Sequence, residues 1–124
     1  MTTRTPKPVL VRNDRALWSA HALGPPNRST QAVVKIGNHL FALGRYNQFA
    51  DDAILSITRH LTSPGHVPAS QALAILRRYV RTHWPGILAL QTYTDPSHQG
   101  TSYRADGWVY VASHKGQRRW LRSI

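Results

Sequence analysis

Strand-forming residues dominate two neighbouring stretches in the first half of the chain, residues 32–36 and 39–43. Only Gly37 and Asn38 separate the two stretches. A two-residue Gly-Asn link between such runs is typical of a β-hairpin with a type II′ turn. The pattern therefore predicts a pair of antiparallel strands here.

A strand, a helix and a second strand are expected further along. Residues 53–61 have the composition of a strand, and a helix is expected from a Ser70 cap to Trp84. The second strand spans residues 86–95, where Pro96 ends it. A strand-helix-strand unit of this kind is right-handed and joins parallel strands. The residues expected to face the core from this helix are Leu73, Leu76, Val80 and Trp84.

Four further elements complete the predicted fold. Asn13 is the expected cap of a helix over residues 14–22, with an apolar stripe of Ala16, Leu17 and Ala20. A short helix over 101–106 lies between two glycines, a strand follows it to His114, and a last strand covers 117–124. The predicted fold class is α+β: a mixed, mainly antiparallel sheet flanked by helices, with one parallel β-α-β unit.

The domain organisation follows from the same patterns. Residues 1–12, with two prolines and three basic side chains, are expected to form a basic arm or an edge strand at Val9–Val11. Residues 13–124 are expected to form one domain, since no repeat, linker or low-complexity segment interrupts them.

Charge and composition narrow the functional classes. Sixteen Lys and Arg face five Asp and Glu, a net charge of +11, which favours nucleic acid as partner over a solubilising surface or a contact with an acidic protein. Without cysteine, the chain has no disulfide, thiolate metal site or Cys nucleophile. No apolar run is long enough for a membrane span, and residues 1–10 lack a signal-peptide core. We therefore expect a cytoplasmic protein without a membrane partner.

Polar residues collect where the two parallel strands are predicted to end. Asp95 closes one strand, and Arg59 and His60 come near the end of the other. Parallel neighbours end at the same edge of a sheet, so these residues are expected to lie beside the start of the helix at Ser70. The free backbone N–H groups of a helix N-terminus bind phosphate. A cleft is therefore expected at this edge.

One contiguous segment carries a family resemblance. Residues 93–110, YTDPSHQGTSYRADGWVY, resemble the Tyr-x-Asp-Pro, Gly-His-x-Gly and Tyr-x-Ala signature of Mom-type phage DNA-modification proteins. Residues 53–70 resemble the strand, loop and helix start of that family, and residues 19–24 resemble its His-Tyr-x-Gly motif, with Ala22 in place of the tyrosine. The resemblance covers about residues 14–115 and implies the fold of the GNAT acyltransferases.

The resemblance implies a reaction. A protein of phage or mobile-element origin would transfer an acyl group from an acyl-CoA-type donor, such as acetyl-CoA, to the exocyclic amine of adenine in DNA. Asp95 would accept or orient the proton of the amine, Tyr103 would donate to the departing thiolate, and Ser102 would offer an oxygen to the carbonyl or the base. Each has a plainer alternative: a helix cap for Asp95, a core aromatic for Tyr103 and a solvated surface residue for Ser102.

The resemblance also suggests binding residues. The pyrophosphate loop of the wider superfamily corresponds to Ser63-Pro64-Gly65, so the expected cofactor-binding residues are Arg59, Ser63, Gly65 and Ser70. A metal of the kind attributed to Mom-type proteins would fall on His21, Asp95 and Tyr103. The spacing of the seven histidines does not independently indicate a metal.

Adenine in a duplex would have to be flipped or reached in an opened strand. Six arginines are candidate phosphate contacts: Arg77, Arg78, Arg81, Arg118, Arg119 and Arg122. Trp108 or Trp120 would stack on a base, or else belong to the core. Two other functions stay open: a non-catalytic DNA-binding or interaction protein on the same fold, and an acyltransferase for a protein or a small amine. The sequence does not indicate an oligomeric state.

Overall fold

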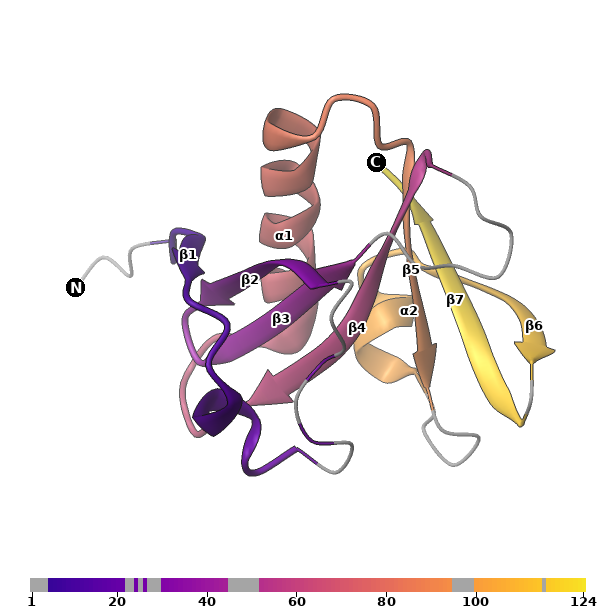
Figure 1. Cartoon of the computed structure of the whole chain (residues 1–124). Helices are drawn as coiled ribbons and strands as arrows, with labels where there is room; N and C mark the ends of the chain where they lie inside the picture. The colour runs from indigo at the N-terminus through magenta and orange to yellow at the C-terminus, as the bar shows by residue number, and fades with distance from the viewer. Residues whose placement is uncertain are drawn as a thin grey trace.

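The computed structural model describes residues 5–21, 24, 26, 30–44, 52–94, 100–114 and 116–124, with the side chains of 112–114 excepted. Within these ranges, seven strands form one mixed sheet, and two α-helices and one 3₁₀ turn accompany it (Figure 1). The elements are β1 Val9–Val11, η1 Arg15–Trp18, β2 Thr30–Ile36, β3 His39–Gly44, β4 Ile54–Thr62, α1 Ala69–His83, β5 Ala89–Thr94, α2 Thr101–Ala105, β6 Val109–His114 and β7 Gln117–Ser123.

The strand order is β1-β2-β3-β4-β5-β7-β6. β4 and β5 run parallel, connected through α1, whereas every other described neighbouring pair is antiparallel. Figure 1 shows α1 and α2 on the same side of the sheet. The α+β class, the mainly antiparallel sheet and its one parallel β-α-β unit are therefore confirmed.

The predicted hairpin is confirmed as β2 and β3, which pair from Ile36↔His39 outwards. Gly37 has a φ of +57°, which its lack of a Cβ permits. A Cβ at this position would also lie 2.5 Å from Cγ2 of Val67, in the loop before α1. The turn thus requires glycine at position 37 for two reasons, its positive φ and the close approach of Val67. The same turn packs the hairpin against the loop before α1.

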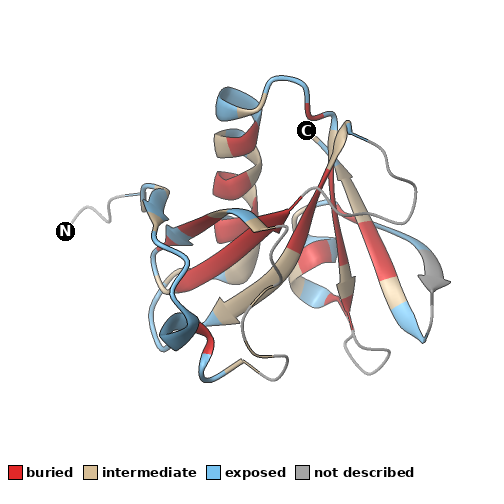
Figure 2. Cartoon of the chain, in the orientation of Figure 1, coloured by how far each residue is buried: buried red, intermediate tan, exposed pale blue. Residues whose placement is uncertain are grey.

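Two apolar clusters cover the two faces of the sheet. The larger one lies beneath the helices and includes Phe41, Leu55, Leu76, Tyr103 and Trp120. The smaller one, on the other face, consists of Trp18, Val33, Leu40 and Ala42, with Val11 and Leu61 packed against it. Figure 2 shows the buried positions concentrated on the central strands and along one side of α1.

The expected helix over residues 14–22 is wrong. The chain forms only the 3₁₀ turn η1, and its cap is Asp14, whose Oδ1 accepts from the N–H of Ala16 at 3.0 Å. Trp18 alone is buried in this turn, and its Nε1 donates to Asn13 Oδ1 at 3.2 Å. A single aromatic side chain anchors the segment, so the apolar stripe that a longer helix needs is missing. The residues predicted for that stripe, Ala16, Leu17 and Ala20, are exposed.

The helix α1 was predicted well except at its start. Leu73, Leu76 and Val80 are buried, as expected from their spacing. The helix begins at Ala69 after Pro68 and has no side-chain cap, so Ser70 lies inside the first turn and does not cap it. Proline restricts its own φ without donating a hydrogen bond, and this suits the residue before a helix. None of the described helices is long and apolar enough to cross a bilayer.

Candidate functional site

The parallel strands β4 and β5 separate part-way along their length. They pair over four positions, from Ile54↔Ala89 to Ile57↔Thr92. β4 then continues to Thr62 and β5 to Thr94, and the two arrows diverge in Figure 1. Strand edges that face each other without pairing offer backbone N–H and C=O groups to an extended ligand.

An extra residue in β4 coincides with this separation. The register with β3 shifts between Ala42↔Arg59 and Leu43↔Ile57, which leaves Thr58 unmatched. A β-bulge of this kind changes which face the following side chains occupy. Ile57 belongs to the cluster beneath the helices, whereas Arg59 pairs with Ala42 of the opposite cluster. The bulge therefore carries Arg59 to the face opposite α1.

Arg59 fastens the N-terminal segment to β4. Its Nε donates to the carbonyl of Gly24 at 3.2 Å, and its NH1 donates to the carbonyl of Thr58 at 2.7 Å. Burial lowers the pKa of Arg59. The pKa of His21 is lowered, first by burial and then by the positive charge of Arg59. A hydrogen bond to the backbone of His60 raises this pKa, but by less. His21 thus lies along the second half of β4, beside a cation.

Tyr103 reaches the point where the strands part. Its side chain is 6% exposed, and its hydroxyl hydrogen-bonds with Thr92. Thr92 Oγ1 also donates to the carbonyl of Ile57 at 3.1 Å, so Thr92 connects Tyr103 to β4. Burial raises the pKa of Tyr103, and the Thr92 bond acts in the other direction. Tyr103 therefore holds its proton at neutral pH, next to the last paired residues of β4 and β5.

The helix that carries Tyr103 is fixed at both ends. Gly100, with a φ of +71°, lies so close to the indole of Trp120 that a Cβ would collide with it. At the other end, the buried carboxylate of Asp106 accepts from Arg77 at 2.7 Å and from Trp108 Nε1 at 2.9 Å. These contacts join α2 to α1 and to the core, so Tyr103 has a defined position.

Two histidines that no sequence pattern singled out as a pair meet at the end of β4. His39 Nε2 lies 2.6 Å from the carbonyl of Val67, and its Nδ1 lies 3.0 Å from His60 Nε2 and 3.2 Å from Thr62 Oγ1. A carbonyl only accepts, so Nε2 of His39 donates and, in the neutral ring, Nδ1 accepts. Only the strand register brings these positions together, since 21 residues separate the two histidines. The pair attaches the loop before α1 to the sheet.

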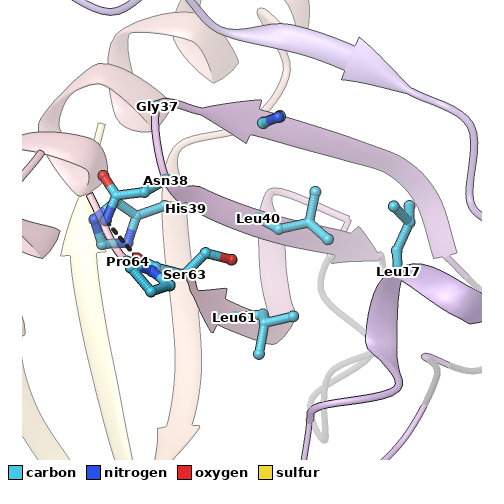
Figure 3. Close-up of a pocket in the computed structure, with 9 residues that line it drawn as sticks. Leu17, Gly37, Asn38, His39, Leu40, Leu61, Ser63 and Pro64 are labelled. Atoms are coloured by element: carbon cyan, nitrogen blue, oxygen red, sulfur yellow. Dashed lines mark hydrogen bonds between the residues drawn. The ribbon is translucent and has the colours of Figure 1, made fainter. Parts of the chain in front are cut away.

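That loop borders a hollow of about 390 Å³ beside the hairpin turn (Figure 3). Leu17, Leu40 and Leu61 give it an apolar part, and Asn38 and Ser63 belong to its polar part. The polar residues are bonded to each other. Asn38 Nδ2 donates to the carbonyl of Ser63 at 2.9 Å, and the N–H of Ser63 donates to the carbonyl of Asn38 at 2.8 Å. A Cβ on Gly65 would lie 2.5 Å from the Asn38 Cβ. The predicted phosphate loop is therefore packed against the β2–β3 turn.

The residues predicted for DNA contact fall into two groups. Arg78 and Arg81 are exposed on α1, and Arg118 is half-buried on β7. The other three have short bonds to identified partners: Arg77 to Asp106, Arg119 to Gln91 Oε1 at 2.8 Å, and Arg122 to the carbonyl of Asp106 at 2.9 Å. Arg119 is only 5% exposed, so a direct phosphate contact is wrong for it.

Both tryptophans considered as base-stacking residues are buried, Trp108 at 4% and Trp120 at 0% exposure, so their core interpretation is the one observed. Ser102 lies half-buried in the first turn of α2. Asp95, the proposed base, lies outside the described residues.

The metal site implied by the resemblance has little support in this geometry. His21 lies beside the Arg59 guanidinium on the face opposite α1, and Tyr103 packs in the cluster beneath the helices. A neighbouring cation opposes the binding of another cation. Among the described residues, no three His, Asp or Glu side chains gather into a metal-binding group. The described members of the set therefore do not fit a metal.

A family model and solved structures relate the chain to known proteins. The model of the Mom protein family matches residues 33–122, more than half of the chain. The structure is similar to a GNAT-family acetyltransferase from Listeria monocytogenes, with 9% identity over 75% of this chain and 63% of that one and a TM-score of 0.57. It is also similar to an acetyltransferase from Thermus thermophilus, with 13% identity over 75% and 62% of the two chains and a TM-score of 0.54.

No curated protein matches the sequence significantly. The chain spans less than two thirds of the length of either acetyltransferase. At these identities the likeness shows a shared GNAT fold.

Proposed function

This chain belongs to the Mom protein family and has a GNAT-like fold, and on that premise we propose that it is a DNA-modifying N-acyltransferase of phage or mobile-element origin. It takes the acyl group from an acyl-CoA-type thioester and transfers it to the exocyclic amine of adenine.

The observation that carries the proposal is the early separation of β4 and β5 with the Tyr103 hydroxyl at its apex. The separated edges can bind the amide groups of an extended thioester arm through their backbone. α1 starts beside the end of β4 without a side-chain cap, so its first N–H groups are available to the phosphates of the donor. The described residues thus fit a CoA-type donor.

The proton transfers can be assigned to two side chains. As the amine attacks the thioester carbonyl, Asp95 accepts a proton from the nitrogen. When the carbon–sulfur bond breaks, the sulfur takes the hydroxyl proton of Tyr103. Thr92 holds that hydroxyl in place, and burial keeps it protonated until it is needed. Ser102, half-buried in the first turn of α2, would offer an oxygen to the acyl carbonyl or the base.

DNA is proposed as the substrate on two grounds. The net charge of +11 attracts a polyanion, and the family membership connects the chain to Mom proteins. The adenine amine is reached in a flipped base or an opened strand.

A second candidate is a non-catalytic DNA-binding protein on the same fold. The observation that favours it is the buried position of Tyr103, whose hydroxyl already has a partner in Thr92.

The test is mass spectrometry of nucleosides from the DNA of bacteria that express the protein. We expect an acylated deoxyadenosine with the native protein and a loss of it with Asp95→Ala and with Tyr103→Phe. Tyr79→Phe is the matched control, since Tyr79 is a partly buried tyrosine on α1 that packs against His83 and Trp84. Modified adenine that persists in both variants contradicts the catalytic roles, and unmodified adenine with the native protein favours the second candidate.

A further inference from the structure

A small basic hollow lies on the α2 side of the sheet, near its β6 edge. It has a volume of about 260 Å³, and its described lining residues are Arg104 of α2, Tyr110 of β6 and Arg118 of β7. Tyr110 pairs with Trp120 in the register, and the two rings meet edge to face at 5.6 Å. Arg118 precedes Trp120 by two residues on β7 and therefore shares its face.

The core holds this hollow in shape. The guanidinium of Arg104 lies 5.1 Å from the centre of the Trp120 ring, and Trp120 is fully buried, with its Nε1 bonded to Thr94 at 2.9 Å. A guanidinium over an aromatic face is attracted to it. Arg104 and Tyr110 thus rest on the same fixed indole and keep a defined separation.

The lining combines two positive charges with a flat apolar surface. The part of the lining that the structure describes contains no acidic residue. The Tyr110 side chain is 44% exposed, unlike the buried tryptophan beneath it. Guanidinium groups bind phosphate through directed hydrogen bonds, and an exposed aromatic ring accepts a stacked base. A nucleotide offers both features at once, whereas an acidic peptide offers only the charge.

We propose that Arg104, Tyr110 and Arg118 form a contact site for one nucleotide of a single DNA strand, with the phosphate between the arginines and the base on Tyr110. This proposal rests on the proposed function only because it assumes that the bound nucleic acid is DNA. Its residues come from α2, β6 and β7, whereas the separation lies between β4 and β5, so the site would hold the strand while another nucleotide occupies the cleft.

Fluorescence anisotropy of a labelled single-stranded oligonucleotide of mixed sequence, over a series of salt concentrations, tests the site. We expect Arg104→Gln and Arg118→Gln each to weaken binding about threefold to tenfold and to reduce the salt slope by about 1. Tyr110→Leu should weaken binding at least about fivefold with the slope unchanged, and Tyr110→Phe should bind like the native protein. Circular dichroism and thermal unfolding verify that each variant is folded.

Arg15→Gln is the matched control, because Arg15 is an exposed arginine of η1, remote from β6 (Figure 1). If Arg104→Gln and Arg118→Gln bind the oligonucleotide as tightly as this control does, the proposed site is overturned. A Tyr110→Leu variant that binds like the native protein also overturns it, as does polyglutamate that displaces the oligonucleotide as well as unlabelled DNA does at equal charge.

Nucleoside mass spectrometry separates this test from that of the proposed function. If the native protein modifies adenine but the Arg104, Tyr110 and Arg118 variants bind DNA normally, the nucleotide site is overturned and the proposed function is not. If adenine stays unmodified but these variants lose DNA binding as expected, the nucleotide site is supported and the proposed catalysis is contradicted.

Discussion

The two halves of β4 differ in composition, partners and burial. Residues 54–57 pair with β5, Ser56 and Ile57 also pair with β3, and Leu55, Ser56 and Ile57 are all buried. Residues 59–62 pair with β3 only, Thr58 has no register partner, and all five residues are partly or fully exposed. The bulge at Thr58 marks the boundary. One strand thus serves the core up to the bulge and supplies the candidate cleft beyond it.

The largest effect that tests this contrast is a truncation in the first half. Leu55 is fully buried, so Leu55→Ala should lower the free energy of unfolding by about 2–5 kcal/mol. Leu61→Ala makes the same chemical change in the partly exposed second half and should cost about 1 kcal/mol. Urea unfolding followed by circular dichroism measures both. Equal losses would mean that the two halves are equally structural.

The next effect concerns the anchor of α2. Asp106→Ala leaves Arg77 without its acid partner, and we expect a loss on the order of 3 kcal/mol in urea unfolding. Asp14→Ala, which removes an exposed cap, should cost about 1 kcal/mol. A loss at Asp106 no larger than the one at Asp14 would show that the ion pair does not hold α2 in place.

A smaller effect probes the apex of the cleft. Thr92→Val keeps the side-chain shape but removes the hydroxyl between Tyr103 and Ile57, and should cost about 1 kcal/mol. Because the Thr92 bond lowers the pKa of Tyr103, its loss should raise that pKa further. Ultraviolet absorption during alkaline titration should show later ionisation of one tyrosine than in the native protein. Unchanged titration would place the Tyr103 hydroxyl elsewhere.

The smallest effect depends on pH. Burial and the Arg59 charge hold the pKa of His21 below its ordinary 6.5, so the folded protein resists protonation there. This contribution to stability is complete above the unfolded pKa and is lost as the pH falls through the folded one. The urea midpoint of His21→Asn should therefore fall less than that of the native protein between pH 7.5 and 5.5, roughly one unit either side of the ordinary histidine pKa. An equal fall in both would exclude His21 as a source of acid sensitivity.

The elements with strong local signals were predictable. The Gly37-Asn38 turn and the apolar spacing of α1 depend on neighbours in the chain, and both were found. The prediction of a helix over residues 14–22 was wrong because Trp18 packs against strands distant in the sequence. This packing overrides the local pattern.

The candidate site was less predictable for the same reason. Tyr103 was chosen through a family signature, and its bond to Thr92 and the engagement of Arg119 by Gln91 depend on strand register. The His39–His60 pair and the bulge at Thr58 depend on it too, and no local pattern records register across distant strands.

The place of β7 has a consequence for how the chain folds during synthesis. β7 is made after the six other described strands, yet it lies inside the sheet between β5 and β6. Until residues 117–123 leave the ribosome, β5 lacks its antiparallel neighbour and β6 cannot join the sheet. The nascent protein therefore presents unpaired strand edges, which are prone to intermolecular pairing. A chaperone that shields such edges would matter most just before translation of this strand is complete.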